Sequence, residues 1–209
     1  MVISQNQQNE MTAKDVVNYL KQGNLRFVEG HLQAVNDKQV LNHNAQGQYP
    51  LAFILSCVDS RVSPEIIFDQ TLGSVFVGRV AGNVVDSSIL ASMEFATHLS
   101  GTKLIVVMGH TQCGAVAGAC QGVVLGHITE LFSRIQPAVD AVGCCVHDEA
   151  QRVTQVVKQN VLNQMAWIEQ HSVIIARDIQ EEKVLLVGAM HTIATGQVVF
   201  FDGKGRALA

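Results

Sequence analysis

The sequence predicts an α/β fold in which a mostly parallel central β-sheet is flanked by helices and preceded by an N-terminal helical arm. Short apolar runs of strand length alternate with segments whose apolar residues recur at helical spacing. The chain has 209 residues, which suits one domain with a sizeable core. Because no internal repeat is evident, we expect a single domain over 1–209, with an arm over about 1–46 and a core over about 47–209.

The arm is expected to hold a helix followed by a polar connection. Thr12 can cap a helix that fades by Gly30. Residues 31–50 are polar and show no regular apolar spacing. They end in a turn, Gly47 to Pro50, that leads into the first strand.

In the core, apolar runs predict strands at 51–55, 75–77, 103–108, 184–188 and 198–201. Helices are expected between them, at about 63–70, 86–98, 114–120, 127–142 and from 148 onward. Ser63, Asp86 and Asp148 stand at the starts of three of these helices. There their side chains can accept hydrogen bonds from free backbone N–H groups.

Composition excludes two classes of protein. The net charge of −4 gives no basic footprint for nucleic acid. No stretch of membrane-spanning length is free of polar residues, so the apolar content of 48% is interpreted as buried subunit interface. The first ten residues are rich in Gln and Asn and lack the pattern of a signal peptide, so a cytoplasmic location is expected.

The five cysteines are Cys57, Cys113, Cys120, Cys144 and Cys145. An odd number without framework spacing favours metal ligation or simple burial over structural disulfides. Cys120 falls in a run of small residues and is expected to be buried there. The adjacent pair at 144 and 145 is assigned no role.

Chemically active residues follow two of the predicted strands. Cys57, Asp59 and Arg61 follow the first strand, and alternate residues of an extended chain point the same way. His110 and Cys113 follow the strand at 103–108. Because sites in such sheets form at the carboxyl ends of strands, we expect these two strand ends to share one zinc ion.

Two thiolates and one imidazole leave the fourth position of a tetrahedral zinc open, which is the arrangement of catalytic zinc. The alternative is that both cysteines are merely buried and that His110 is merely hydrogen-bonded. That alternative would have to hold at both strand ends together, so we favour the metal. Asp59 and Arg61 could be a surface ion pair, but an arginine fork beside a metal can also fix the direction of a carboxylate.

The remaining histidines show no pairing at metal-ligand spacing. They are expected to be exposed, or buried with their hydrogen bonds satisfied. They are His31, His43, His98, His127, His147, His171 and His191.

The segments 57–61, Cys-Val-Asp-Ser-Arg, and 110–114, His-Thr-Gln-Cys-Gly, resemble the signature of the beta-class carbonic anhydrases, C-x-D-S-R with H-x-x-C-G. The resemblance covers roughly residues 12–202. It also includes the segments 47–50, 67–70, 77–83, 188–189 and 195–196.

The resemblance implies a lyase with one Zn²⁺ per subunit that interconverts carbon dioxide and bicarbonate, with release of a proton, by attack of zinc-bound hydroxide. Cys57, His110 and Cys113 would be the zinc ligands, and Asp59 and Arg61 the catalytic dyad. Zinc held by two thiolates is formally neutral and acidifies water less than zinc held by three histidines, so surrounding groups must assist.

Other positions match the substrate pocket of plant-like members of this family. They are Gln48, Phe76, Phe95 and Gly114. The family builds this pocket across a homodimer interface, with the glutamine supplied by the neighbouring subunit, so a dimer or a tetrameric dimer of dimers is expected. Phe95 stands where many members have tyrosine, and it lacks that residue's hydroxyl.

The resemblance also implies an inactive state in which Asp59 leaves Arg61 and takes the fourth zinc position. Some members close in this way at lower pH, with bicarbonate bound beside a tryptophan and a tyrosine. Those positions correspond here to Ile54 and His191. We therefore expect no inactivation of this bicarbonate-dependent kind.

The sequence also bears on three other functions. A zinc deaminase requires H-x-E and P-C-x-x-C, and neither occurs. A hydrolase of carbon disulfide or carbonyl sulfide with the same fold stays open. So does a non-catalytic zinc-binding assembly module, although an open coordination position favours catalysis.

Overall fold

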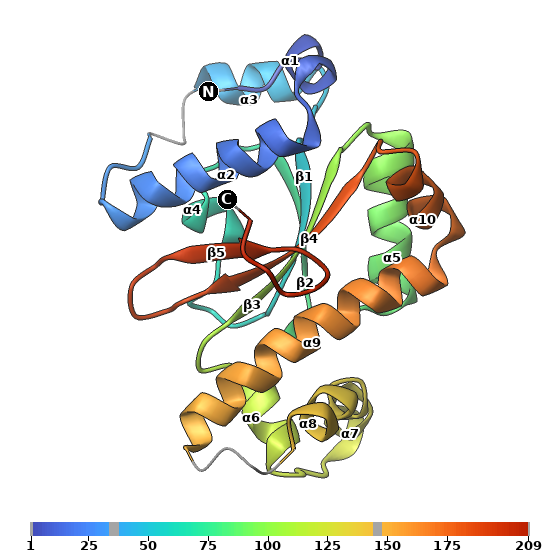
Figure 1. Ribbon diagram of the computed structural model, residues 1–209. Helices are drawn as coiled ribbons and strands as arrows, with labels where there is room; N and C mark the ends of the chain where they lie inside the picture. The colour runs from blue at the N-terminus through green and yellow to red at the C-terminus, as the bar shows by residue number, and fades with distance from the viewer. Residues whose placement is uncertain (1, 34–37, 144–147, 209) are drawn as a thin grey trace.

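A five-stranded β-sheet in the order β2-β1-β3-β4-β5 forms the centre of the computed structural model (Figure 1). The structure describes residues 2–33, 38–143 and 148–208. The strands are β1 (Ala52–Ser56), β2 (Val75–Arg79), β3 (Leu104–His110), β4 (Leu185–His191) and β5 (Val198–Phe201). The first four run parallel, and β5 is antiparallel to β4. The mostly parallel α/β fold and the five predicted strands are therefore confirmed.

Helices cover both faces of the sheet (Figure 1). One face packs against α2 (Ala13–Val28) and α4 (Pro64–Ile67). The other face packs against α5 (Ser87–Glu94), α9 (Glu149–His171) and α10 (Val173–Gln180). Because both faces are covered, every residue of β1 and β3 is buried, which explains their continuous apolar runs.

Three short helices pack together beside the first half of α9 (Figure 1). They are α6 (Gly114–Cys120), α7 (Gly126–Ser133) and α8 (Gln136–Val142). The prediction of one helix over 127–142 is wrong. Pro137 lies in the first turn of α8, where its ring is tolerated but could not continue a helix from α7.

The arm contains more helix than the sequence predicts. α2 begins after Thr12, whose hydroxyl caps it as expected. A further helix, α1 (Gln5–Glu10), precedes it. α3 (Lys38–Asn44) lies within 31–50, so the prediction of an irregular connection is wrong for that part. Both helices are short and rich in polar residues, and they show little of the apolar periodicity by which helices are recognised.

Asp86 and Asp148 cap α5 and α9 as predicted. Beyond Glu94 the helix continues as a π-helical turn, η2 (Phe95–Leu99). Ser63 precedes α4, but its hydroxyl hydrogen-bonds to the carboxylate of Glu65 instead of capping the helix.

Three of the residues considered in the sequence analysis cannot be compared with the structure. Cys144, Cys145 and His147 lie beyond the described residues. Within 2–33, 38–143 and 148–208, none of the helices combines the length and the apolar composition that a bilayer crossing requires.

Candidate metal centre

Two neighbouring parallel strands bring the predicted ligands together. Leu55 of β1 pairs with Val107 of β3, so Cys57 and His110 leave the same edge of the sheet shortly afterwards. Cys113 follows as the N-cap residue of α6. The tight turn between His110 and Cys113 includes Gln112, whose φ is 58°.

Cys57, His110 and Cys113 are all buried, and their ligand atoms lie within 4.8 Å of one another. The two sulfur atoms are 3.9 Å apart. Two sulfurs held tetrahedrally at 2.3 Å from one zinc would be about 3.8 Å apart. The donor set and its spacing therefore fit a zinc ion with a fourth position open.

The hydrogen bonding of His110 also suits a metal ligand. Its Nδ1 lies 2.9 Å from the carbonyl oxygen of Thr111, to which it can donate. That leaves Nε2 as the unprotonated nitrogen, and among the described residues Nε2 has no hydrogen-bond partner. A buried nitrogen fixed by a backbone carbonyl on the far side of the ring is typical of metal-binding histidines.

The sulfurs of Cys57 and Cys113 are close enough for one thiol to donate a hydrogen bond to the other sulfur. The hydrogen bond with Cys113 and the backbone N–H groups of Asp59 and Gly82 lower the pKa of Cys57 to about 4. The thiolate of Cys57 and the burial of the site raise the pKa of Cys113 well above its ordinary value. These contacts favour one thiolate, the form that binds metal, within the pair.

Asp59 and Arg61 form a two-point ion pair. Arg61 donates from Nε to Oδ1 at 2.9 Å and from Nη2 to Oδ2 at 2.7 Å. These hydrogen bonds hold the pKa of Asp59 far below its usual range. Nη2 of Arg61 also approaches the carbonyl oxygen of Gln112, at 3.3 Å, so the pair reaches the turn that carries Cys113.

The pair forms for a different reason from the one predicted. β1 ends at Ser56, so Asp59 and Arg61 are not placed by strand alternation. A turn closed by a hydrogen bond from Val62 N to Asp59 O brings the arginine back over the carboxylate.

Two residues without a predicted role support Cys57. Arg79, at the end of β2, donates to the carbonyl oxygens of Cys57 at 3.0 Å and of Asp59 at 2.7 Å. The backbone N–H of Gly82, in the short turn η1 (Ala81–Asn83), donates to the Cys57 sulfur at 3.3 Å. Both residues lie in segment 77–83, which resembles the family. That resemblance is the one sign in the sequence that they belong to the site.

The environment of His191 differs from the one predicted. It is buried beside His110 across the β3–β4 pairing, and neither ring nitrogen has a partner among the described residues. Burial lowers its pKa to about 4, so it is uncharged at neutral pH. The expectation of an exposed or satisfied histidine is wrong here. It holds for the exposed residues His31, His43, His98, His127 and His171.

The predicted pocket residues are not gathered in one chain. Phe76 and Phe95 meet edge to face with ring centroids 6.1 Å apart, and they line a groove of about 540 Å³ that includes none of the candidate zinc ligands. Half of Phe95 is exposed. Gln48 is exposed just ahead of β1, at the opposite end of that strand from Cys57. Gly114 alone adjoins the ligands, as the first residue of α6.

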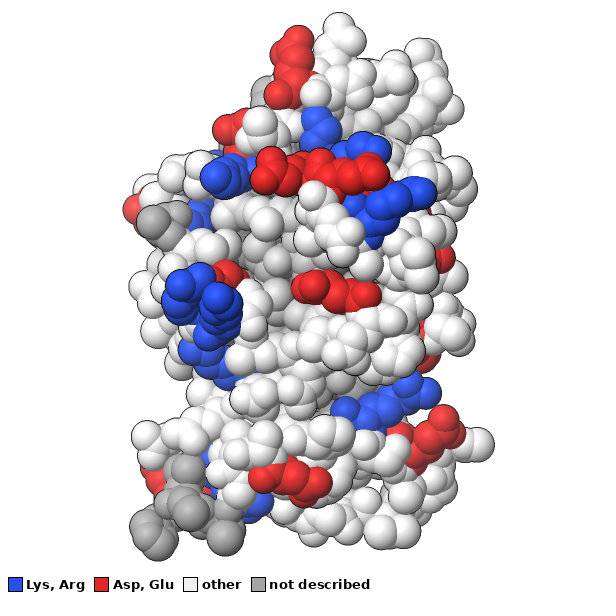
Figure 2. Space-filling view, turned by 45° about the vertical axis from the view of Figure 1, so that its right-hand side comes forward, with Lys and Arg blue, Asp and Glu red and all other residues white. Residues whose placement is uncertain are grey.

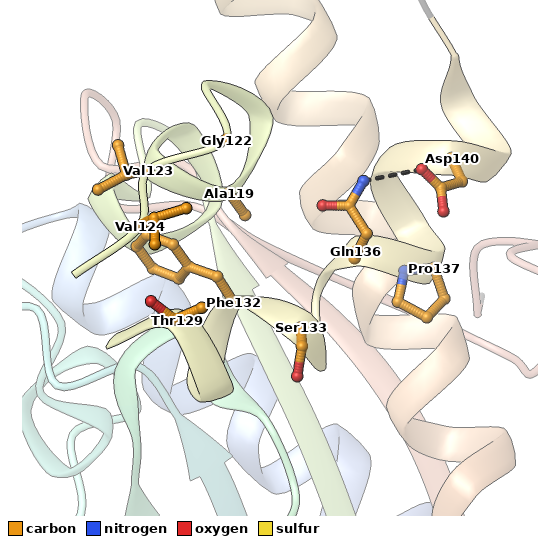
Figure 3. A pocket seen from close by; sticks show the side chains of 10 residues that line it. All are labelled: Ala119, Gly122, Val123, Val124, Thr129, Phe132, Ser133, Gln136, Pro137 and Asp140. Atoms are coloured by element: carbon orange, nitrogen blue, oxygen red, sulfur yellow. Dashed lines mark hydrogen bonds between the residues drawn. The ribbon is translucent and has the colours of Figure 1, made fainter. Parts of the chain in front are cut away.

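A second hollow lies between α6, α7 and α8 (Figure 3). Phe132 and the pair Val123 and Val124 give it an apolar wall, and Gln136 donates to Asp140 at its edge. Cys120 of α6 is only partly buried, so its predicted burial is incomplete.

On the face shown in Figure 2, Lys and Arg lie among Asp and Glu, and neither sign of charge forms a broad patch.

Comparison with known proteins agrees with this geometry. The carbonic anhydrase family model matches residues 52–198. Carbonic anhydrase 2 of Mycobacterium tuberculosis is 37% identical over 194 residues, which cover 89% of this chain and 91% of that protein.

Solved structures show the same fold. A tetrameric beta-carbonic anhydrase of Sordaria macrospora matches with a TM-score of 0.74 and 25% identity, over 83% of this chain and 89% of that one. The Coccomyxa beta-carbonic anhydrase in complex with acetazolamide matches with a TM-score of 0.70 and 26% identity, over 78% and 76%. With the family model and the relative above, these matches establish that the chain belongs to the beta class of the carbonic anhydrase family.

Proposed function

We propose that this protein catalyses the zinc-dependent, reversible hydration of carbon dioxide to bicarbonate and a proton. The observation that carries the proposal is the buried group Cys57, His110 and Cys113, with the paired Asp59 and Arg61 at its edge. Family membership supports the reaction.

One zinc per chain would be held by the two sulfurs and by Nε2 of His110. When bound there, it supplies a Lewis acid that brings water to its nucleophilic form near neutral pH. The chain contributes a fixed donor set. The Thr111 carbonyl orients His110, and the Gly82 N–H offsets part of the negative charge on Cys57.

Asp59 would act as the acceptor that orients the attacking water. Its depressed pKa keeps it ionised throughout the neutral range, so it can only accept a hydrogen bond and cannot donate one. Arg61 occupies both carboxylate oxygens and so fixes their direction. We infer that the same contact keeps Asp59 from turning onto the metal, which would close the site.

The substrate pocket would be completed by a second copy of the chain. Gln48, Phe76 and Phe95 are set apart from the ligands within one chain, and Phe95 is half exposed. A homodimer, or a dimer of dimers, would bring these side chains from one copy to the zinc of the other. The tetrameric Sordaria relative is consistent with such assembly. The backbone N–H of Gly114 would then contact bicarbonate beside the metal.

Stopped-flow measurement of carbon dioxide hydration, with and without a zinc chelator, tests the proposal. We expect turnover that is lost with zinc and restored by its return. Turnover of carbon disulfide or carbonyl sulfide that exceeds carbon dioxide hydration would favour the hydrolase. Stoichiometric zinc without turnover of any of the three would favour a non-catalytic zinc module.

A further inference from the structure

Two amide side chains are buried in the apolar face of α9. Asn160 is fully buried and Gln164 nearly so. Their buried neighbours on this helix are Val153, Val156, Val157, Val161, Met165 and Ile168. Burying an amide among such residues is unfavourable unless its hydrogen bonds are satisfied. Helix packing would be served by apolar side chains at these two positions. The amides therefore indicate a need for hydrogen bonds there.

Both amides bind the backbone of the loop that follows β2. Asn160 Nδ2 donates to the carbonyl oxygen of Gly82 at 2.8 Å. Gln164 Oε1 accepts the N–H of Val85 at 2.8 Å, and Gln164 Nε2 donates to Asn160 Oδ1 at 3.2 Å. The two side chains thus form one connected network from the helix to the loop.

The loop needs this support because its backbone is unusual. Gly82 and Asn83 have φ values of 66° and 47°, in the left-handed region that side chains other than glycine rarely adopt. In this conformation the N–H of Gly82 points to Cys57 while its carbonyl points to α9.

We propose that Asn160 is a positioning residue for the metal centre, which acts through Gly82 to hold a backbone N–H on the sulfur of Cys57. The Cys57 and Cys113 sulfurs lie 3.9 Å apart in a buried site, where the negative charge of a thiolate is poorly solvated. A fixed N–H donor offsets part of that charge, and it also defines where the sulfur stands before metal arrives. Gln164 holds the amide of Asn160 in the required orientation.

The inference rests on the proposed zinc enzyme, and it is tested on the intact protein with metal alone as the probe. Asn160→Leu removes the amide and keeps the branching of the side chain, with a moderate increase in volume. We measure the zinc dissociation constant by competition with a chelator, and the sulfur-to-metal charge-transfer absorption of the cobalt(II)-substituted protein. Ile168→Ala is the matched control, because it removes buried packing from the same helix about one turn beyond Gln164, the last residue of the network.

We expect Asn160→Leu to weaken zinc binding roughly 10- to 100-fold and to move the charge-transfer band to longer wavelength, since the thiolate becomes more electron-rich. Ile168→Ala should lower the thermal midpoint while leaving both metal readouts unchanged. Zinc affinity and a cobalt spectrum in Asn160→Leu that match the unaltered protein would overturn the inference. A wild-type protein that binds no zinc would instead refute the proposed function.

If Asn160→Leu does not fold, Gln164→Met decides the question. It keeps the length of the side chain and removes both of its hydrogen bonds. A smaller change in the same two readouts supports the inference, and unchanged readouts overturn it.

Discussion

Arg61 donates hydrogen bonds to both carboxylate oxygens of Asp59, from Nε to Oδ1 at 2.9 Å and from Nη2 to Oδ2 at 2.7 Å. The pair lies at the edge of the group formed by Cys57, His110 and Cys113. A carboxylate held in this way has a fixed direction and a fixed charge. Because Nη2 of Arg61 also approaches the Gln112 carbonyl, the ion pair connects the ends of β1 and β3. We propose that the pair orients the group that attacks the substrate at this site.

Asp59→Asn should leave zinc bound and reduce carbon dioxide hydration by roughly 100-fold or more, because an amide can turn its N–H₂ toward the attacking water and lose the orienting acceptor. Metal content and stopped-flow hydration are measured on the same preparation. Near-wild-type turnover in this variant would contradict the role given to Asp59.

Arg61→Ala should also retain stoichiometric zinc and lose most activity, here because the released Asp59 turns onto the metal. The cobalt(II)-substituted variant should show a changed coordination spectrum, and the double variant with Asp59→Asn should not show that change. Arg206→Ala is a suitable control, since Arg206 makes a similar contact with Asp202 on the exposed surface. An Arg61→Ala enzyme with full activity would show that Asp59 needs no guard.

The contribution of the ion pair to the free energy of unfolding depends on pH. The pKa of Asp59 is depressed below the ordinary 3.8 in the folded chain, so the pair stabilises the protein above about pH 4. This contribution is lost as pH falls through the folded-state pKa. In zinc-free protein, the difference in unfolding free energy between wild type and Asp59→Asn should be constant from pH 7 to about 5 and shrink below 4. Urea titrations at pH 7, 5 and 3 test this, and a difference that grows on acidification would disprove it.

The candidate metal ligands could be predicted from the sequence, whereas the residues that surround them could not. Cys57, His110 and Cys113 could be predicted because each lies at or just beyond the end of a buried strand that its apolar run reveals. The contact between His191 and His110 depends on the register of β4 against β3, which no local pattern encodes. Asn160 is harder still, since an amide within an apolar helical stripe looks like a break in periodicity until α9 is seen packed against the loop.

Gly82→Ala should destabilise the protein by about 1–3 kcal/mol and weaken zinc binding, because φ at this position is 66° and an added Cβ would lie 2.7 Å from Cδ1 of Ile135. Moving the loop would also remove the N–H from the Cys57 sulfur. Gly203→Ala is the control, since the nearest atom to its added Cβ lies 4.0 Å away. Urea unfolding and chelator competition measure the two effects. Equal stability and zinc affinity in both variants would show that the turn tolerates a side chain.

Assembly can be tested by mixing two defective chains. Gln48 lies at the opposite end of β1 from Cys57, so we expect it to act in the site of the neighbouring copy. In a mixed dimer of Gln48→Ala and Asp59→Asn chains, one site collects both defects and the other receives an intact Gln48 and an intact Asp59. Co-refolding equal amounts should therefore restore about a quarter of wild-type hydration, since about half of the dimers are mixed and each has one intact site. Each variant refolded alone serves as the baseline, and a mixture no more active than the average of the two would place Gln48 outside the partner's site.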